Sequence, residues 1–375
     1  MGKKLSVGVL FGGNSPEHQI SLLSARNVIQ ALDPEKYDLL LIGIEKTGEW
    51  RIRSAENYLV NAQDARRIEL GEFGDWVAAV PSGKEGKFTA LDSEGKEHAV
   101  DVVIPILHGI NGEDGTVQGV LKLAGIPFVG PGVLGAAIGM DKDVMKRLWR
   151  DGGLSVARFM TFHRSHSGRI RFSEVAETLG LPLFVKPASC GSSVGISKVS
   201  NEAEFERAIQ LAFSYDLKIL CEEAIEGREF ECSVIGNEDP IVSLPGEIIP
   251  KVSFYTYEAK YIDEEMVDFV VPARVTPEEL TAIQTAALKG YQLVCSEGMG
   301  RVDCFLRPNG EVILNEINTL PGLTNMSLFH QLWEASGMPL SKVLDRLIGL
   351  ALSRHRAELT LKSYYPIDTL AGQLR

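Results

Sequence analysis

The sequence predicts an α/β protein, and three observations lead to this class. Apolar strands at residues 5–11 and 39–44 flank a helical pattern, which is the β-loop-α-β order of a doubly wound sheet. A third apolar strand, residues 100–107, runs into a glycine-rich loop. Residues 301–318 alternate in the way of a β-hairpin, so antiparallel structure is expected later in the chain.

Composition limits the class of protein and its partners. The chain has 375 residues, enough for two or three domains, with 45% hydrophobic and 23% charged residues. The net charge of −12 argues against binding to nucleic acid or to anionic membranes, and no apolar run is long enough to span a bilayer. The 5 cysteines form no C-x-x-C pair and predict reduced thiols in a cytoplasmic protein.

The first helix is expected to begin at Ser15 as N-cap with Pro16 in the first turn, and to end before Asp33. Glu17 then lies in the first turn, where stabilisation of the helix dipole by about 0.3–1 kcal/mol is one explanation and ligand binding another. No G-x-G-x-x-G motif is present, so no dinucleotide site is predicted.

The strand at residues 100–107 leads into His108 and a loop with three glycines, residues 109–115. Such a loop at the carboxyl end of a buried strand indicates a ligand crevice. A helix at residues 116–124, a strand at 126–129 and a Gly-Pro-Gly break at 130–132 should close a first domain, residues 1–132.

The middle of the chain predicts a helix at 134–149 and strands at 156–162 and 183–186. Residues 188–195 form a small-residue loop before a strand at 196–199. This loop could donate backbone N–H groups to phosphates or be a plain flexible hairpin, and it is not a Walker loop. Ser200 is expected to cap a helix at 202–213.

Two further strands, residues 218–221 and 230–235, are bordered by Glu222 and Glu229, acids for which solvent exposure is the usual outcome. Residues 251–265 have no clear period and predict a lid or a disordered loop. The remaining predicted helices are an amphipathic one at residues 277–296 and two more at 327–334 and 340–357.

The hairpin carries the strongest chemical pattern. With Asn309-Gly310 as a two-residue loop, Asp303 lies opposite Glu316, and Arg301 opposite Asn318. The opposite face should pack on helices; it contains, apart from the polar Asn315, the apolar residues Val302, Cys304, Leu306, Ile313 and Ile317.

Opposed carboxylates repel each other unless a cation lies between them. Asp303, Glu316 and Asn318 offer only oxygen ligands, which suits Mg²⁺ or Mn²⁺ and not Zn²⁺. The alternative is a solvated polar face on which Arg301 neutralises Asp303. The pattern alone leaves both interpretations open.

Seven segments occur in one fixed order: FGGNSPEHQIS, LHGINGEDG, MDK, VKPASCGSSVGISKV, YEAKY, RVD and NEINTLPGLTNMS. Together, from residue 7 to residue 327, they resemble the D-alanine–D-alanine ligases of the ATP-grasp superfamily. The resemblance implies three domains, residues 1–132, 133–224 and 225–375. The last two, of α+β type, would clasp ATP between two sheets.

The resemblance also implies roles for particular residues. The ATP-binding residues would be Lys142, Lys186, Ser193, Glu222, Glu223, Ala224, Ile225, Glu229 and Asn315. The ligands of two Mg²⁺ ions would be Asp303, Glu316 and Asn318. The catalytic residues would be Glu17, Ser192, Tyr261, Arg301, Gly322 and Ser327. Residues that hold the two D-alanines would be Glu17, His108, Lys260, Arg301, Ser327 and Leu328.

By the same resemblance the protein would be a cytoplasmic homodimer that makes D-alanyl-D-alanine for peptidoglycan. The phosphate loop contains Ala188-Ser189-Cys190, where relatives often carry charged residues. The nearest rivals are ATP-grasp ligases that use D-lactate or D-serine. The intact set of site residues argues against a regulatory protein with an inactive site.

Overall fold

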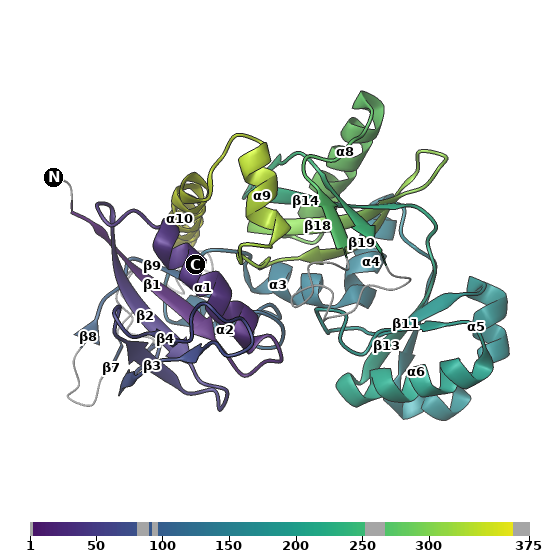
Figure 1. The fold of residues 1–375 in the computed structure, drawn as a ribbon, viewed down its shortest axis with the longest axis horizontal. Coiled ribbons are helices and arrows are strands. Elements are labelled where there is room, and N and C mark those ends of the chain that lie inside the picture. The colour runs from purple at the N-terminus through teal and green to yellow at the C-terminus, as the bar shows by residue number, and fades with distance from the viewer. Residues whose placement is uncertain (1–2, 81–89, 92–96, 252–266, 363–375) are drawn as a thin grey trace, which may run out of the picture.

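The computed structural model describes residues 3–80, 90–91, 97–251 and 267–362. Three larger sheets follow one another across the molecule, with helices packed against each (Figure 1). The predicted α/β class is confirmed. The lid expected at residues 251–265, with Lys260 and Tyr261, lies almost wholly outside the described residues. None of the described helices has the length and apolar character to cross a lipid bilayer.

The first sheet has the strand order β6-β3-β2-β1-β9. Its centre is parallel, as predicted, because β1 pairs in parallel with both β2 and β9. The strands are β1 (Leu5–Gly12), β2 (Tyr37–Ile44), β3 (Trp50–Arg53), β6 (Phe73–Trp76) and β9 (Val102–Ile106). Two small hairpins accompany it, β4 (Leu59–Val60) with β5 (Glu69–Leu70) and β7 (Ala90–Leu91) with β8 (Glu97–His98).

Helices cover both faces of this sheet. On one face, α1 (His18–Ala31) and the C-terminal helix α10 (Leu340–Leu359) share a core with β1 (Figure 1). On the other face lies α2 (Thr116–Leu123). The predicted start of the first helix is wrong by two residues: Ser15 Oγ accepts a hydrogen bond from Glu17 N, 3.1 Å, in a turn that precedes the helix. Glu17 is therefore the N-cap residue of α1.

The predicted helix at residues 134–149 is wrong in one respect, because the structure has two helices there. These are α3 (Val133–Met140) and α4 (Lys142–Asp151). Asp141 between them is extended, with ψ 99°, and its side chain accepts hydrogen bonds from Asp143 N and Val144 N. The capping side chain thus starts a new helix, and Lys142 becomes its first residue.

The second sheet has the order β10-β13-β11-β12 and is antiparallel. Its strands are β10 (Phe159–His163), β11 (Leu183–Pro187), β12 (Ser197–Val199) and β13 (Lys218–Glu223). A 3-10 helix η1 (Arg164–Arg169) follows β10, and α5 (Phe172–Leu179) and α6 (Glu202–Tyr215) bury one face of the sheet. The cap of α6 is Asn201 and not Ser200, since the Asn201 side chain accepts from Glu204 N.

The third sheet has the order β17-β16-β14-β18-β19, with β15 beside β14. Its strands are β14 (Arg228–Gly236), β15 (Ile241–Val242), β16 (Gly246–Pro250), β17 (Val267–Val270), β18 (Gly298–Leu306) and β19 (Val312–Asn318). One face packs on α4 and on α8 (Pro277–Leu293). The helix α9 (Leu328–Ala335) follows the loop after β19 and contacts β14.

The predicted register of the hairpin is confirmed at one end and wrong at the other. Arg301 pairs with Asn318, and Asp303 with Glu316. The turn, however, has three residues, because Arg307 N donates to Glu311 O at 2.9 Å and Leu306 pairs with Val312. A register shift between Asp303 and Cys304 absorbs the difference of one residue.

This shift moves three side chains relative to the prediction. Ile313 pairs with Phe305 and lies with it on the cavity face, whereas the sequence placed it on the packing face. Leu314 takes its place in the core, opposite Cys304. Asn315, the polar exception on the predicted packing face, lines the cavity instead.

Candidate active site

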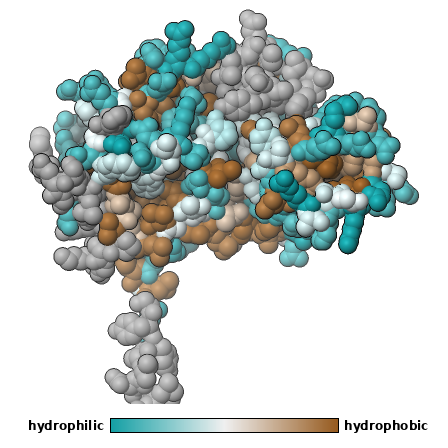
Figure 2. Space-filling view, turned by 90° about the horizontal axis from the view of Figure 1, so that it is seen from below, coloured by the Kyte–Doolittle hydropathy of each residue, from teal (hydrophilic) through white to brown (hydrophobic). Residues whose placement is uncertain are grey.

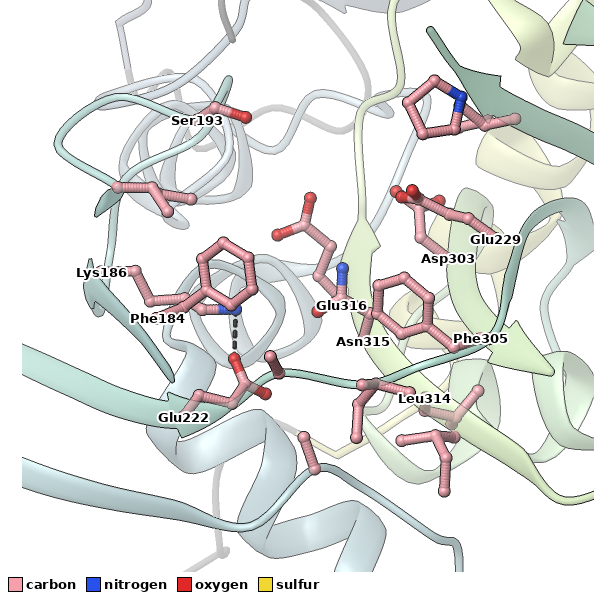
Figure 3. A pocket seen from close by; sticks show the side chains of 18 of the residues that line it. Phe184, Lys186, Ser193, Glu222, Glu229, Asp303, Phe305, Leu314, Asn315 and Glu316 are labelled. Carbon is pink, nitrogen blue, oxygen red and sulfur yellow. Dashed lines mark ion pairs between the residues drawn. The ribbon is translucent and has the colours of Figure 1, made fainter. Parts of the chain in front are cut away.

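Three cavities meet between the sheets. The largest, about 500 Å³, lies between the second and third sheets (Figure 3). A hollow of about 70 Å³ lies beside the N-terminus of α1, and a smaller one of about 20 Å³ lies beside the start of α4. Glu316 lines all three, so a group bound in any of them lies close to this carboxylate.

Every described residue that the sequence assigned to the site lines one of these cavities. The largest is lined by Lys186, Ser193, Glu222, Glu223, Ala224, Ile225, Glu229, Asp303, Asn315 and Glu316. The hollow beside α1 is lined by Glu17, His108, Ser192, Arg301, Asn318, Gly322, Ser327 and Leu328. The smallest has Lys142 in its wall. Lys260 and Tyr261 lie outside the described residues.

Two lysines of the sequence prediction face acidic partners. Lys142 Nζ donates to Cys190 O at 2.8 Å and lies 3.5 Å from Glu316 Oε2. Lys186 forms an ion pair with Glu222, marked by the dashed line in Figure 3. The expected exposure of Glu222 is wrong, because only 3% of this residue is accessible.

Lys146 is a buried site lysine that the sequence prediction missed. It is 0% exposed, and its Nζ lies 2.5 Å from Glu222 Oε1. Burial opposes ionisation of Glu222, but the charges of Lys146 and Lys186 outweigh it and hold the pKa of this carboxyl below its ordinary value. Lys146 is four residues from Lys142, which puts both lysines on one face of α4. This spacing could have indicated Lys146 as a site residue.

The far end of the large cavity is suited to a flat ring. Residues 224–227 connect β13 to β14, and part of this connection lines the cavity. Figure 3 places the rings of Phe184 and Phe305 on opposite sides of the space, with Glu229 beside Asp303. Glu223 Oε2 accepts from Arg158 Nε at 2.7 Å, which fixes the start of the connection. An aromatic ligand can stack here, with acidic acceptors at its edges.

On the polar face of the β18–β19 hairpin, Asp303 is not solvated, since it is only 4% exposed, whereas Glu316 and Asn318 are half-buried. Arg301 does neutralise it: Nε donates to Asp303 Oδ1 at 2.8 Å and Nη2 to Oδ2 at 2.7 Å. Asn318 Nδ2 also donates to Asp303 Oδ2, at 3.1 Å. Thus the arrangement combines a buried acid with the ion pair of the alternative interpretation.

Glu231 is a second residue that the sequence prediction missed. Its Oε2 lies 2.8 Å from Arg301 Nε, and it pairs with Asp303 across β14 and β18. Alternation within β14 puts Glu229 and Glu231 on one face, so the predicted strand could have indicated it. The Arg301 guanidinium consequently lies between two carboxylates.

Among the described residues, no three or more histidine, cysteine or acidic side chains form a complete metal cage. Asp303, Glu316 and Asn318 supply two carboxylates and one amide on adjoining positions of the hairpin. This set fits Mg²⁺, which is commonly held by one or two carboxylates together with substrate phosphates and water. It does not fit Zn²⁺, since nitrogen and sulfur ligands are lacking in the set.

The hollow beside α1 contains a second group of acids, of which Glu17 is buried and Glu113 is half-buried. Glu17 accepts a hydrogen bond from Ser192 Oγ of the loop after β11. Gly109, at φ +71°, passes so close that an added Cβ would lie 2.8 Å from Glu17 Oε2. Glu113 accepts from Gly109 N at 2.7 Å, and burial, then the charge of Glu17, raises the pKa of Glu113 to about 8. A cationic group is the natural ligand of this hollow.

The opposite wall of the same hollow is the loop after β19. Ser327 Oγ accepts from Thr324 N at 3.0 Å, which holds the loop closed. A Cβ at Gly322 would lie 3.0 Å from Ser327 Oγ, so a side chain there would crowd the turn. Burial lowers the pKa of His108 to about 4, and its ring is therefore neutral at pH 7.

The fold and the site together define a class of protein, an α/β enzyme with a nucleotide-sized cavity between two antiparallel sheets. The family model described as D-ala D-ala ligase N-terminus matches residues 6–131, and the one described as D-ala D-ala ligase C-terminus matches residues 148–349. The chain belongs to the D-alanine–D-alanine ligase family, as the sequence motifs predicted.

Individual relatives agree with this assignment. The chain is 48% identical to D-alanine–D-alanine ligase A of Escherichia coli K12 over 361 residues, 96% of this chain and 99% of the relative. It is 48% identical to the D-alanine–D-alanine ligase of Shouchella clausii, over 97% of this chain and 98% of the relative.

Solved structures of the family share the fold. The D-alanine-D-alanine ligase from Coxiella burnetii has a TM-score of 0.81 at 34% identity, covering 96% of this chain and 97% of that one. The VanG D-Ala:D-Ser ligase from Enterococcus faecalis has a TM-score of 0.80 at 36% identity, covering 93% and 100%.

Proposed function

We propose that the protein joins two molecules of D-alanine, with ATP converted to ADP and phosphate, to supply D-alanyl-D-alanine for peptidoglycan precursors. Family membership supports the reaction class. The observation that carries the assignment to this site is the position of Glu316, which lines all three cavities. Nucleotide, cation and amino acid would meet at one carboxylate, as transfer of a phosphoryl group to an acid requires.

ATP would occupy the cavity between the second and third sheets. The base would lie between Phe184 and Phe305, beside the connection from Glu223 to Ile225. Glu229 would accept from the ribose hydroxyls. Glu222 would accept a hydrogen bond from the purine amino group. Each of its carboxylate oxygens can accept two hydrogen bonds and is paired with only one lysine, so one position on each oxygen remains.

The phosphates would extend toward the start of α4. Lys142 and Lys186, with the backbone of the loop that carries Ser193, would receive them. Asp303, Glu316 and Asn318 would hold two Mg²⁺ ions, or Mn²⁺, against the phosphate oxygens. When bound, such ions offset the repulsion between the phosphates and the entering carboxylate.

In the first step, the carboxylate of one D-alanine attacks the γ-phosphorus of ATP. The bond to ADP breaks, and D-alanyl phosphate forms. Glu17, oriented by Ser192, would hold the ammonium of this D-alanine and so fix its carboxylate toward the phosphates. Because acyl phosphates hydrolyse readily, the site must exclude water during this step.

In the second step, the free amine of the other D-alanine attacks the acyl carbon, and phosphate leaves. A negative charge develops on the former carbonyl oxygen. Arg301 and the backbone N–H of Gly322, which line the same hollow, would stabilise it. Ser327 and Leu328 at the start of α9 would hold the second D-alanine.

One assay tests the reaction and its nearest alternative. We expect phosphate release from ATP and Mg²⁺ to depend on D-alanine and to be far slower with L-alanine or D-lactate. D-Serine is included because the structure resembles a D-Ala:D-Ser ligase. Absence of D-alanine-dependent release would refute the proposal, and preferred incorporation of D-serine would favour the alternative. By the family resemblance, ligases that use D-lactate tend to have Phe at the position of Tyr261 or a different lid, so replacing Tyr261 by Phe should raise the use of D-lactate relative to D-alanine.

The protein would act as a cytoplasmic homodimer. Apolar residues gather across the middle of the face shown in Figure 2. Large apolar side chains are exposed at the ends of two helices that the Lys122–Glu358 ion pair joins, namely Leu123 at 77% and, just after α10, Leu361 at 72%. Such exposure favours self-association. Sedimentation of the wild type and of Leu123→Asp should show a dimer and a loss of dimer, respectively.

A further inference from the structure

Helix α4 connects the two sheets on either side of the large cavity. Its Met145 and Trp149 are buried in the core of the third sheet. Its two lysines contact different sheets. Lys142 reaches Glu316 on β19 of the third sheet, whereas Lys146 reaches Glu222 on β13 of the second sheet. Figure 1 shows α4 between these sheets. The Lys146–Glu222 ion pair therefore joins the second sheet to a helix that belongs to the core of the third.

Lys146 has no access to the cavity, because it is fully buried and does not line it. Glu222 and Lys186 do line it. The Glu222 carboxylate thus forms ion pairs with two ammonium groups. Lys186 lines the cavity, and Lys146 lies on the side of the carboxylate away from the cavity. This cluster carries one positive charge in excess.

We propose that Lys146 is a positioning residue for nucleotide binding, which acts by remaining the counter-ion of Glu222 while Lys186 turns to the phosphates. The proposal rests on the function proposed above, with ATP in this cavity. Removing one partner of a buried ion pair leaves an uncompensated charge, which is strongly unfavourable. Without Lys146, Glu222 would retain Lys186, and the phosphates would compete with that carboxylate for it.

The chain contains a matched control. Lys218 also joins β13 to α4, through ion pairs with Asp141 and with Asp143, 3.5 Å away. It does not line the large cavity and does not contact Glu222. Replacing Lys218 by Met therefore removes a lysine that connects the same two elements and leaves the lysine cluster at the cavity intact.

The experiment compares Lys146→Met with Lys218→Met. ADP affinity is measured by calorimetry, and KM is measured for ATP and for D-alanine. We expect Lys146→Met to weaken ADP binding and raise KM for ATP by about tenfold or more, with KM for D-alanine changed less than about twofold. Lys218→Met should leave ADP affinity within about twofold of the wild type, whatever its effect on thermal stability.

A double substitution keeps the test decisive if Lys146→Met fails to fold. In a Glu222→Gln background no carboxylate is left to compete with the phosphates for Lys186, so adding Lys146→Met should change ADP affinity by less than about threefold. Equal losses of ADP affinity in Lys146→Met and Lys218→Met would overturn this inference and leave the proposed function standing. An undiminished loss on adding Lys146→Met to Glu222→Gln would have the same meaning. Absence of ADP binding by the wild type would overturn the proposed function as well.

Discussion

Arg301 and Asp303 lie two residues apart on β18 and are joined by two hydrogen bonds, of 2.8 Å and 2.7 Å. Both oxygens of Asp303 are thus occupied by the guanidinium. A cation that takes Asp303 as ligand has to share this carboxylate with the guanidinium or displace one of these bonds. Glu231, 2.8 Å from Arg301 Nε, offers the guanidinium a second carboxylate within the site. Cation binding at Asp303 and the position of Arg301 are therefore expected to be linked.

Arg301→Gln should separate the two roles of this pair. Loss of the proposed oxyanion donor should lower kcat by about 10²–10³-fold. Mn²⁺ affinity, measured by electron paramagnetic resonance with ADP present, should be unchanged or tighter because the competitor for Asp303 is gone. A nearly normal kcat would remove Arg301 from the acyl step.

Asp303→Asn and Glu316→Gln should both abolish turnover while the circular dichroism spectrum stays that of the wild type. The reason is the loss of negative ligands for the cations that the phosphates require. Glu311→Gln is the matched control, since Glu311 lies at the turn of the same hairpin, where Arg307 is its partner at 3.3 Å. Substantial activity in either of the first two variants would show that the metal face is misassigned.

Glu17→Gln should raise KM for the first D-alanine by roughly 10–100-fold, because the ammonium would lose its charged partner. Ser192→Ala should have a smaller effect, about fivefold, since it removes one hydrogen bond that orients Glu17. Initial rates at varied D-alanine measure both effects. KM for ATP serves as the internal control, and an equal change in it would indicate a general disturbance of the site.

The raised pKa of Glu113, about 8, predicts how the stability of the ligand-free protein depends on pH. Between the ordinary pKa of 4.5 and 8, the folded state keeps a proton that the unfolded state releases. The contribution of Glu113 to the free energy of unfolding is therefore full below pH 4.5 and is lost as pH rises toward 8.

Thermal unfolding of the wild type and of Glu113→Gln, followed between about pH 5 and pH 8, checks this sign. The melting temperature of the wild type should fall relative to that of Glu113→Gln as pH rises. A constant difference between the two proteins across this range would contradict the assignment. Saturating D-alanine should reduce the pH dependence, because an ammonium in the hollow lowers the cost of ionising Glu113.

The sequence predicted the chemistry of the hairpin better than its geometry. Period-two alternation placed Arg301, Asp303, Glu316 and Asn318 on one face, and the structure agrees. The alternation could not reveal the irregularity beside Asp303. The same residues fit a two-residue turn with regular pairing and a three-residue turn with a register shift. For that reason Ile313 was assigned to the wrong face.

Other differences arise where tertiary context decides. Lysine in a helix normally lies on the surface. The burial of Lys146 is explained by its ion pair with Glu222, which belongs to a distant strand. The break at Asp141 was visible in principle, since aspartate is a preferred N-cap, but the apolar period on both sides favoured one continuous helix.

The packing of α10 on the first sheet has a consequence for synthesis of the chain. Val343, Leu344, Leu347 and Ile348 belong to the same buried cluster as Val7 and Val9 of β1. Arg354 in addition donates to the backbone oxygens of Phe128 and Gly130, at 2.8 Å and 2.7 Å. The first strands leave the ribosome long before the helix that covers them. An isolated fragment of the first 132 residues should therefore aggregate, and the nascent chain should depend on chaperones until α10 has been made.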